Sequence, residues 1–237
     1  MIRKLLSFAI YSFALIQALH AQEPKDERKL SLRCLTFQMG NGAAEVFVHS
    51  LGAEEGVVGT AVTPKNYLNH ERIDIQLFSA KLVFTTEPNQ ASINDPKKIL
   101  GNAVVGENLQ SAIFMFFPAE KKAGKPPLNI LTFDDSKKAF PPGSLSFVNL
   151  SPLALQLQLE KEKYGFKPGE RKLIKNPPKN ERYSMGMYAF VYVDKQWKRI
   201  AASMWPHPGD IRVIKIAFYN PASKQIEIKG VRDISIP

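Results

Sequence analysis

Short runs in which apolar and polar residues alternate fill most of the chain after residue 30, and this period of two constrains the fold more than any other feature. The clearest examples are residues 73–78, 81–86 and 153–159. Because successive side chains of a β-strand point to opposite sides, each run can bury one face and leave the other in water. The 17 prolines and 14 glycines fall mostly between the runs, where they make turns.

Further runs of this kind continue along the chain. They cover residues 30–37, 45–49, 57–62, 111–117, 128–133, 144–149, 188–193, 197–204, 211–219 and 225–229. Outside the N-terminal stretch no long segment has the spacing of an amphipathic helix, and only short turns near 64–69 and 95–100 suit a helical conformation. Many short strands separated by turn residues are typical of β-sandwiches and barrels. We therefore predict an all-β protein, built as one immunoglobulin-like β-sandwich or as two small sandwiches in tandem.

The N-terminus has the three parts of a secretory signal peptide. Arg3 and Lys4 precede an apolar stretch at 5–19, and Ala21 stands before the polar segment 22–29. A transmembrane anchor is the alternative, but the stretch has about 15 residues where a spanning helix needs about 20. We expect a signal peptide at 1–21, export to the periplasm or the extracellular space, and no transmembrane segment in the processed chain.

Composition narrows the class of protein further. The chain has 237 residues, of which 44% are hydrophobic, so it is too apolar for a disordered protein and long enough for one or two domains. Its one cysteine, Cys34, excludes a disulfide-stapled small domain and a cysteine-rich metal site. A lone cysteine also suits an exported protein, because it has no partner within the chain with which to form a wrong disulfide.

A charged segment rich in glycine and proline, residues 119–127, divides the β-rich part of the chain. We predict a polar linker at 22–29, a first β unit at 30–118, a connection at 119–127 and a second β unit at 128–237. The alternative is one continuous domain in which 119–127 forms a long hairpin loop. The two halves show no convincing repeat by residue identity.

Turn-forming motifs are densest in the second half. They are Pro141-Pro142-Gly143, Asn149-Leu150-Ser151 and the segment 205–212. In a Pro-Gly pair, proline fixes φ and glycine accepts the positive φ that other residues resist. On these motifs, residues 128–233 resemble an uncharacterised family of exported bacterial β-sandwich proteins of the immunoglobulin-like type. The resemblance implies a fold and an exported setting, and it brings no catalytic residues.

The loop that contains Trp205, His207 and Asp210 is the most distinctive candidate site. Pro206 and Pro208 would hold His207 stiffly beside an aromatic ring that could stack on a sugar or another ligand ring. The alternative is a structural loop that joins the last two strands. No pair of histidines has the spacing of metal ligands, so we expect neither a metal site nor a cofactor.

Lysine and arginine outnumber aspartate and glutamate by 32 to 22, which gives a net charge of +10. Many basic residues lie between 120 and 180, and we single out Lys137, Lys138, Arg171 and Lys172. Such a cationic face suits an anionic glycan, another envelope component or an anionic surface. The alternative is that the lysines maintain solubility and protect strand edges from aggregation. Export and the lack of interleaved aromatic residues argue against nucleic acid as the partner.

Three functions follow from these features. The first is an exported, non-enzymatic binding or structural module of the bacterial envelope that engages an anionic glycan or surface. The second is an enzyme acting on an envelope or extracellular polymer, for which His207 needs a carboxylate within hydrogen-bonding distance. The third is assembly through exposed strand edges. The sequence contains no local nucleophile motif, and this favours the first function.

Overall fold

The computed structural model describes residues 28–38, 44–68, 72–119 and 122–234. Within these ranges the protein is all-β, with sixteen strands and one short 3-10 helix, η1 (Gln90–Asn94). The predicted all-β class and its arrangement in sandwiches are confirmed. The expected signal peptide at 1–21 lies outside the described residues, as does most of the expected linker. No helix in the described part of the chain is long and apolar enough to cross a membrane.

The strands fall into two consecutive groups of eight, which we call unit one and unit two. Unit one consists of β1 (Arg28–Thr36), β2 (Val46–Ser50), β3 (Thr60–Val62), β4 (Ile73–Leu77), β5 (Lys81–Thr85), β6 (Ile99–Val104), β7 (Ser111–Pro118) and β8 (Leu128–Asp134). Unit two consists of β9 (Leu145–Asn149), β10 (Leu155–Leu159), β11 (Glu162–Phe166), β12 (Arg171–Ile174), β13 (Ser184–Val193), β14 (Gln196–Pro206), β15 (Arg212–Asn220) and β16 (Gln225–Asp233). Each unit is a sandwich of two four-stranded sheets.

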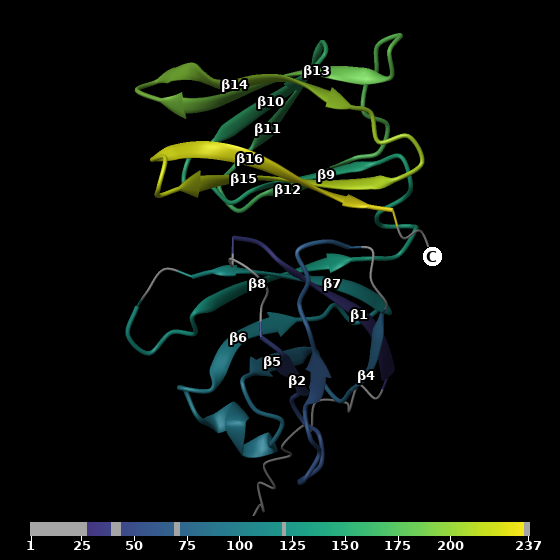
Figure 1. Ribbon diagram of the computed structural model, residues 1–237, viewed down its shortest axis with the longest axis vertical. Helices are drawn as coiled ribbons and strands as arrows, with labels where there is room; N and C mark the ends of the chain where they lie inside the picture. The colour runs from purple at the N-terminus through teal and green to yellow at the C-terminus, as the bar shows by residue number, and fades with distance from the viewer. Residues whose placement is uncertain (1–27, 39–43, 69–71, 120–121, 235–237) are drawn as a thin grey trace, which may run out of the picture.

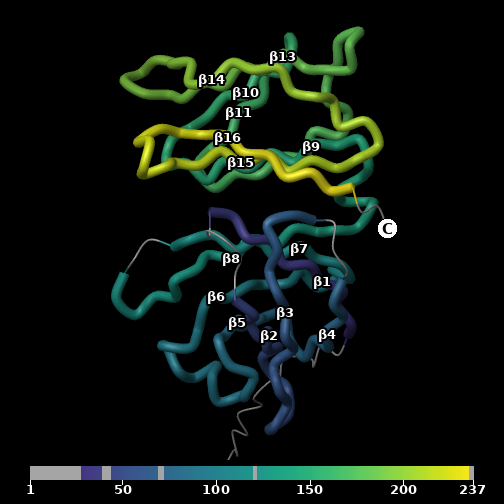
Figure 2. Tube along the Cα trace, viewed as in Figure 1, coloured from purple at the N-terminus to yellow at the C-terminus, as the bar shows by residue number. Residues whose placement is uncertain are grey.

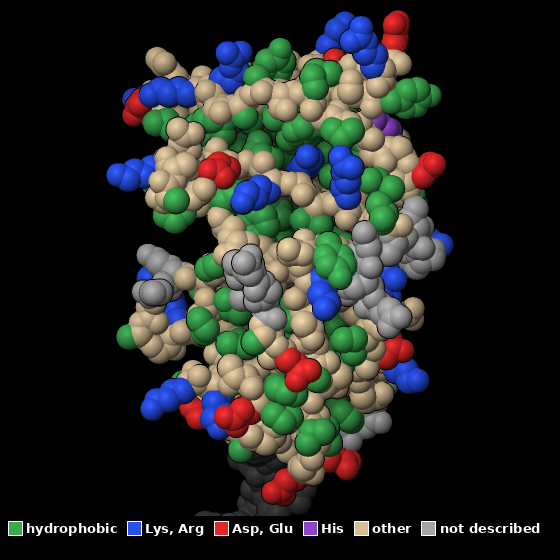
Figure 3. Space-filling model, in the orientation of Figure 1, with side chains coloured by type: hydrophobic (Ala, Val, Ile, Leu, Met, Phe, Trp, Pro, Cys, Tyr) green, Lys and Arg blue, Asp and Glu red, His purple; other side chains and the backbone are tan. Residues whose placement is uncertain are grey.

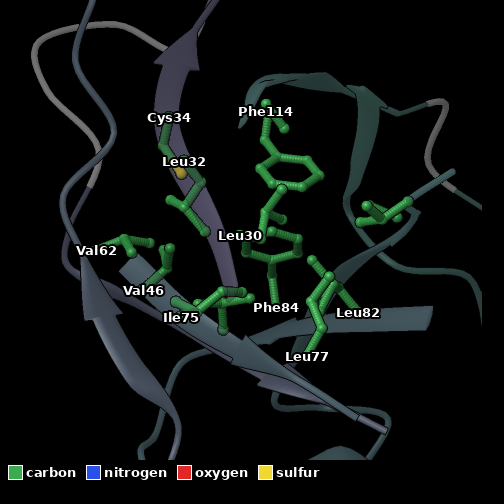
Figure 4. Packing of buried hydrophobic residues seen from close by; sticks show 14 of the residues in the cluster. Leu30, Leu32, Cys34, Val46, Val62, Ile75, Leu77, Leu82, Phe84 and Phe114 are labelled. Atoms are coloured by element: carbon green, nitrogen blue, oxygen red, sulfur yellow. The ribbon is translucent and has the colours of Figure 1, made fainter. Parts of the chain in front are cut away.

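Each unit packs its two sheets around an apolar core of its own. In unit one the strand orders are β4-β1-β7-β8 and β3-β2-β5-β6, and residues such as Leu32, Phe84 and Phe114 fill the space between them (Figure 4). In unit two the orders are β12-β9-β15-β16 and β11-β10-β13-β14, with a core that includes Phe147 and Trp205. The alternating runs of the sequence supply these inward faces, as the burial pattern of β10 illustrates.

The two units repeat one topology, strand for strand. β1 pairs with β7 in parallel at the centre of a sheet of unit one, and β9 pairs with β15 in parallel at the centre of a sheet of unit two. Adding eight to each strand number of unit one reproduces both strand orders of unit two. Residue identity does not reveal this repeat, because a sandwich strand constrains mainly which faces are apolar and many residues satisfy that constraint.

The units stack through the sheets that contain the parallel pairs, so the molecule has four layers (Figures 1 and 2). A third apolar cluster, with residues of β7 and β8 from unit one and of β15 from unit two, lies between these two sheets. The rings of Phe37 and Phe218 meet edge to face there, with centroids 5.0 Å apart. Strand β7 therefore has both faces buried, which explains why residues 112–116 are apolar at every position.

Four buried charged side chains also join the two units. Arg33 of β1 lies with Nη2 2.7 Å from Asp135 Oδ1 and 2.8 Å from Asp233 Oδ2. Arg212, the first residue of β15, donates hydrogen bonds to the same two carboxylates. Asp135 follows the last residue of β8 and Asp233 is the last residue of β16, so equivalent strands of the repeat supply the two acids. Because two positive and two negative charges alternate in contact, each compensates for the desolvation of its neighbours.

The chain passes from unit one to unit two at 135–144 and not at the predicted connection, 119–127. Strands β7 and β8 pair with each other in antiparallel register, so 119–127 connects two strands of one sheet, as the alternative expected. The crossing contains the Pro-Pro-Gly motif. Gly143 in that motif has a φ of 77°, and a Cβ there would lie 3.0 Å from the carbonyl oxygen of Gly209, so the turn requires glycine.

Two local predictions need correction. Only Thr60–Val62 of the predicted run 57–62 forms a strand, because Val57 and Val58 are exposed in the preceding loop. The helical turn occurs at η1 and not at 95–100, since the Asn89 side chain accepts the backbone N–H of Ser92 and caps the helix there. Strand β6 already begins at Ile99.

His49 on β2 is buried beneath Gly59, with Nε2 2.9 Å from Thr85 Oγ1 and 3.4 Å from Ser92 Oγ. Burial lowers the pKa of His49 below its ordinary value of 6.5, and the hydrogen bond with the Glu87 carbonyl offsets this only in part. The unfolded chain then binds the proton more readily than the folded one. We therefore expect the free energy of unfolding to fall as the pH drops below about 6.5.

Replacing His49 with glutamine should remove this part of the pH dependence, because glutamine does not titrate. Urea unfolding of both proteins between about pH 5 and pH 8 measures the effect. Parallel pH profiles for the two proteins would contradict the prediction.

A candidate binding groove between the sheets of unit two

The loop predicted as a site is tied into its surroundings. Trp205 is buried in the core of unit two, near the end of β14. His207 Nε2 lies 3.2 Å from the carbonyl oxygen of Pro177, and His207 Nδ1 accepts a hydrogen bond of 3.1 Å from the N–H of Gly209. Asp210 is exposed, and no carboxylate among the described residues contacts the His207 ring. The imidazole therefore joins two loops and lacks the acidic partner that an enzyme site here would need.

The described residues outside this loop offer no metal centre. No group of three or more histidine, cysteine, aspartate or glutamate side chains within the described ranges is arranged to hold an ion. Cys34 is buried on β1, and burial raises the pKa of its thiol. A buried, protonated thiol is a poor nucleophile, so Cys34 serves as a core residue.

The four basic residues singled out from the sequence lie on β12 and in the turn after β8. Lys137 and Lys138 are exposed in that turn. The guanidinium of Arg171 lies over the ring of Phe133 of β8, 4.9 Å from its centroid, and so crosses the boundary between the units. Lys172 Nζ is 3.2 Å from the carboxylate of the glutamate two residues before it. Arg171 and Lys172 are therefore engaged within the protein, which leaves the two lysines of the turn more available to a partner.

A groove of about 530 Å³ opens between the two sheets of unit two, along the edge strands β14 and β16. Figure 3 shows hydrophobic and basic side chains lying between the two sheets on this face. Apolar residues form most of the lining, and two cations and a tyrosine stand among them. The apolar set includes Leu153, Val191, Ile200 and Ile226, and the polar set includes Arg199, Lys224 and Tyr219. The groove thus combines apolar surface with positive charge.

On the corresponding side of unit one the two edge strands meet. There β8 approaches β6 so closely that a Cβ on Gly101 would lie 2.8 Å from Ile130 Cδ1 and 2.9 Å from the carbonyl oxygen of Leu128. Thr132 Oγ1 also donates a hydrogen bond of 3.1 Å to the carbonyl of Val104. Since β6 and β8 correspond to β14 and β16 in the repeat, the strands that border the groove in unit two are in direct contact in unit one.

A half-buried lysine lies between the sheets of unit two on the same side. Lys215 extends from β15 toward β14, with Nζ 4.3 Å from the centroid of the Trp205 ring. Glycine on the neighbouring strand leaves room for it, because a Cβ on Gly230 would lie 2.8 Å from Nζ. Burial lowers the pKa of the Lys215 amine, and the nearby Arg232 lowers it further. The aromatic ring gives this cation partial stabilisation.

Acidic side chains do not neutralise the groove. Arg199, Lys215, Lys224 and Arg232 form no ion pair with any carboxylate in the described part of the chain. Glu227 on β16 accepts two hydrogen bonds of 2.7 Å from side chains near the β15–β16 turn, and these lower its pKa. Of these four cations only Lys215 is partly buried, so only its charge carries a desolvation cost that an anionic ligand would recover.

Sequence reasoning missed this groove because its lining comes from segments far apart in the chain. Lys215, which lies between the same two sheets, has the one sequence feature that could have indicated a site in this region. It occupies an inward position of a strand, two residues from Val213 and Ala217, where the alternation predicts an apolar side chain. A charge at such a position indicates either a buried ion pair or a binding site.

No protein-family model matches the chain, and no curated protein sequence matches it. The resemblance of residues 128–233 to exported β-sandwich proteins therefore stays a prediction. Function has to be inferred from the geometry and charge of the groove.

Proposed function

We propose that this protein is a non-enzymatic binding module that holds an anionic partner in the groove of unit two. The observation that carries the proposal is an apolar groove whose lining includes two cations without a carboxylate partner, Arg199 and Lys224, with a third cation, Lys215, half-buried between the same two sheets. An anion that reaches Lys215 would recover part of the cost of burying that amine, whereas Arg199 and Lys224 are exposed and would attract the anion by long-range electrostatics. The packed junction with unit one supports this role, because a preorganised groove loses little entropy on binding.

Two expectations from the sequence belong to this proposal. Export directed by a signal peptide at 1–21 would place the groove among anionic glycans and surfaces of the envelope or the extracellular space. An immunoglobulin-like classification would place the protein among binding domains, and the two-sheet construction of each unit supports it. Lys137 and Lys138 are exposed in the turn after β8 and do not line the groove, so the proposal gives them no part in holding the anion.

Replacing both Arg199 and Lys224 with alanine should weaken the binding of an acidic glycan about five- to tenfold, because two rim charges of this kind contribute about 1 kcal/mol together. Polygalacturonate serves as the acidic probe and a neutral glucan as its uncharged counterpart. Titration of the chain without its expected signal peptide, at low and at high salt, measures the affinity. Binding should weaken as salt screens the charges.

The matched control replaces Lys137 and Lys138 with alanine, which removes the same charge outside the groove. We expect this variant to bind polygalacturonate nearly as well as the unchanged protein. Equal affinity for the neutral glucan, or no binding of polygalacturonate at either salt concentration, would overturn the proposal. Loss of binding in the control alone would move the site to the turn after β8.

A further inference from the structure

We infer that the occupant of the groove is an extended peptide strand in which apolar and acidic residues alternate, and that this strand pairs with the free edge of β14. The inference rests on the proposed function, since it uses the same groove and the same cations. It adds the class of the partner and the way in which its backbone is held. The partner would become a fifth strand of the sheet β11-β10-β13-β14.

Strand β14 is suited to accept another strand. It has 11 residues and pairs on one side only, with β13. On its other side, backbone N–H and C=O groups face away from the sheet with no strand of the described chain beside them. Charge and proline, which often protect an exposed edge, are missing from residues 201–204, and the β-bulge of this strand lies just before them, at Ile200. This stretch therefore offers a row of hydrogen bonds to an incoming backbone.

The interior of the groove favours apolar side chains at alternate positions of the partner. Ile200 of β14 and Ile226 and Ile228 of β16 are only partly buried, and they pack against the core of unit two from its open side. In unit one, Leu128 and Ile130 of β8 pack against the core at the corresponding place, where β8 closes against β6. A strand in the groove would cover the three isoleucines. It would do for unit two what β8 does for unit one, where side chains of β8 cover the core.

The charges favour an acidic partner over the other candidates. A second copy of this chain fits poorly, because each copy has a net charge of +10 and the same cationic groove. A glycan or a lipid headgroup would neutralise Arg199 and Lys224 but would leave the edge of β14 unpaired and the isoleucines partly exposed. A strand with acidic residues satisfies the cations, the apolar lining and the backbone edge together.

Three peptides test the inference: a probe, a control that differs from it only in the backbone, and a control that differs from it in charge. The probe is an end-blocked peptide of alternating valine and glutamate, about nine residues long, which is an ordinary strand length. One control carries methyl groups on its central amide nitrogens, and another has lysine in place of glutamate. We expect the methylated peptide to bind at least about tenfold more weakly than the probe, because methylation removes the donors and crowds the edge. The lysine peptide should not bind measurably.

Hydrogen–deuterium exchange locates the contact. The probe should slow exchange of the backbone amides at 200–204, whereas polygalacturonate should leave them unchanged even when it occupies the cations. No binding of the probe, equal binding of the probe and its methylated form, or protection of some other strand would overturn the inference. The proposed function is judged separately by polygalacturonate binding and its loss in the Arg199→Ala, Lys224→Ala variant, so either can fail while the other stands.

Discussion

Replacing Asp135 with alanine should lower the free energy of unfolding by about 3–5 kcal/mol, the cost of breaking a buried charge network by removing one member. The carboxylate of Asp135 accepts hydrogen bonds from Arg33, Arg72 and Arg212, and the side chain is fully buried. In the variant, Arg33 and Arg212 each lose a carboxylate partner and keep that of Asp233 together with hydrogen bonds to backbone carbonyls. Urea unfolding followed by far-ultraviolet circular dichroism measures the change.

Two further variants separate this effect from general sensitivity to mutation. Asp135→Asn preserves the size of the side chain and part of its hydrogen bonding, so its stability should fall between those of the alanine variant and the unchanged protein. Asp210→Ala removes an exposed carboxylate and should change stability by less than about 0.5 kcal/mol. A loss below about 1 kcal/mol for Asp135→Ala would mean that the network contributes no more than a surface ion pair.

The charge network also fixes the strands that present the groove. Arg212 begins β15, which places Lys215 between the sheets three residues later. Asp233 ends β16 directly after Arg232, at the opposite end of that strand from the groove residues 224–226. Both strands are therefore anchored at the boundary with unit one by buried, charge-assisted hydrogen bonds. Under the proposed function, unit one would therefore hold in place the sheet of unit two that carries Lys215 and Arg232.

The fold class followed from the sequence because one apolar face is enough to specify a strand, and most of the predicted runs are strands in the structure. The stacking of the units did not follow. Arg33 alternates with Leu32 and Cys34, so the pattern places its side chain in water, yet it is 1% exposed because unit two covers that face. The pattern of a single strand predicts which of its faces is apolar, but it does not predict what packs against the other face.

The groove was harder to predict for a related reason. The residue types that stand out in a sequence, such as Trp205 and His207, serve here as a core side chain and as a link between loops. The open edge of unit two is visible only by comparison with unit one, where Gly101 allows β6 and β8 to meet. No local pattern distinguishes that glycine from a turn glycine, so the contrast between the two units needed the three-dimensional repeat.

Replacing Phe84 with alanine should lower the free energy of unfolding by about 3–5 kcal/mol, and it should shift the unfolding of both units together. Phe84 is fully buried on β5 beside Phe114 (Figure 4). Its ring lies 5.4 Å from that of Phe114 and 5.0 Å from that of Phe116, measured between centroids. The substitution therefore damages the core of unit one directly. Both tryptophans of the chain, Trp197 and Trp205, are in β14, so tryptophan fluorescence reports on unit two alone.

Coupling between the units makes the fluorescence midpoint in urea move as far as the circular dichroism midpoint, although Phe84 lies in the unit without tryptophan. Unfolding of unit one would separate Asp135 from Arg212 and expose the apolar cluster between the stacked sheets. Phe147→Ala in the core of unit two is the control, because it should lower the fluorescence midpoint whether or not the units are coupled.

An unchanged fluorescence midpoint in Phe84→Ala, with an earlier circular dichroism transition, would contradict the coupling. It would mean that unit two holds its groove open by its own packing, since the buried charges would then transmit no stability across the boundary.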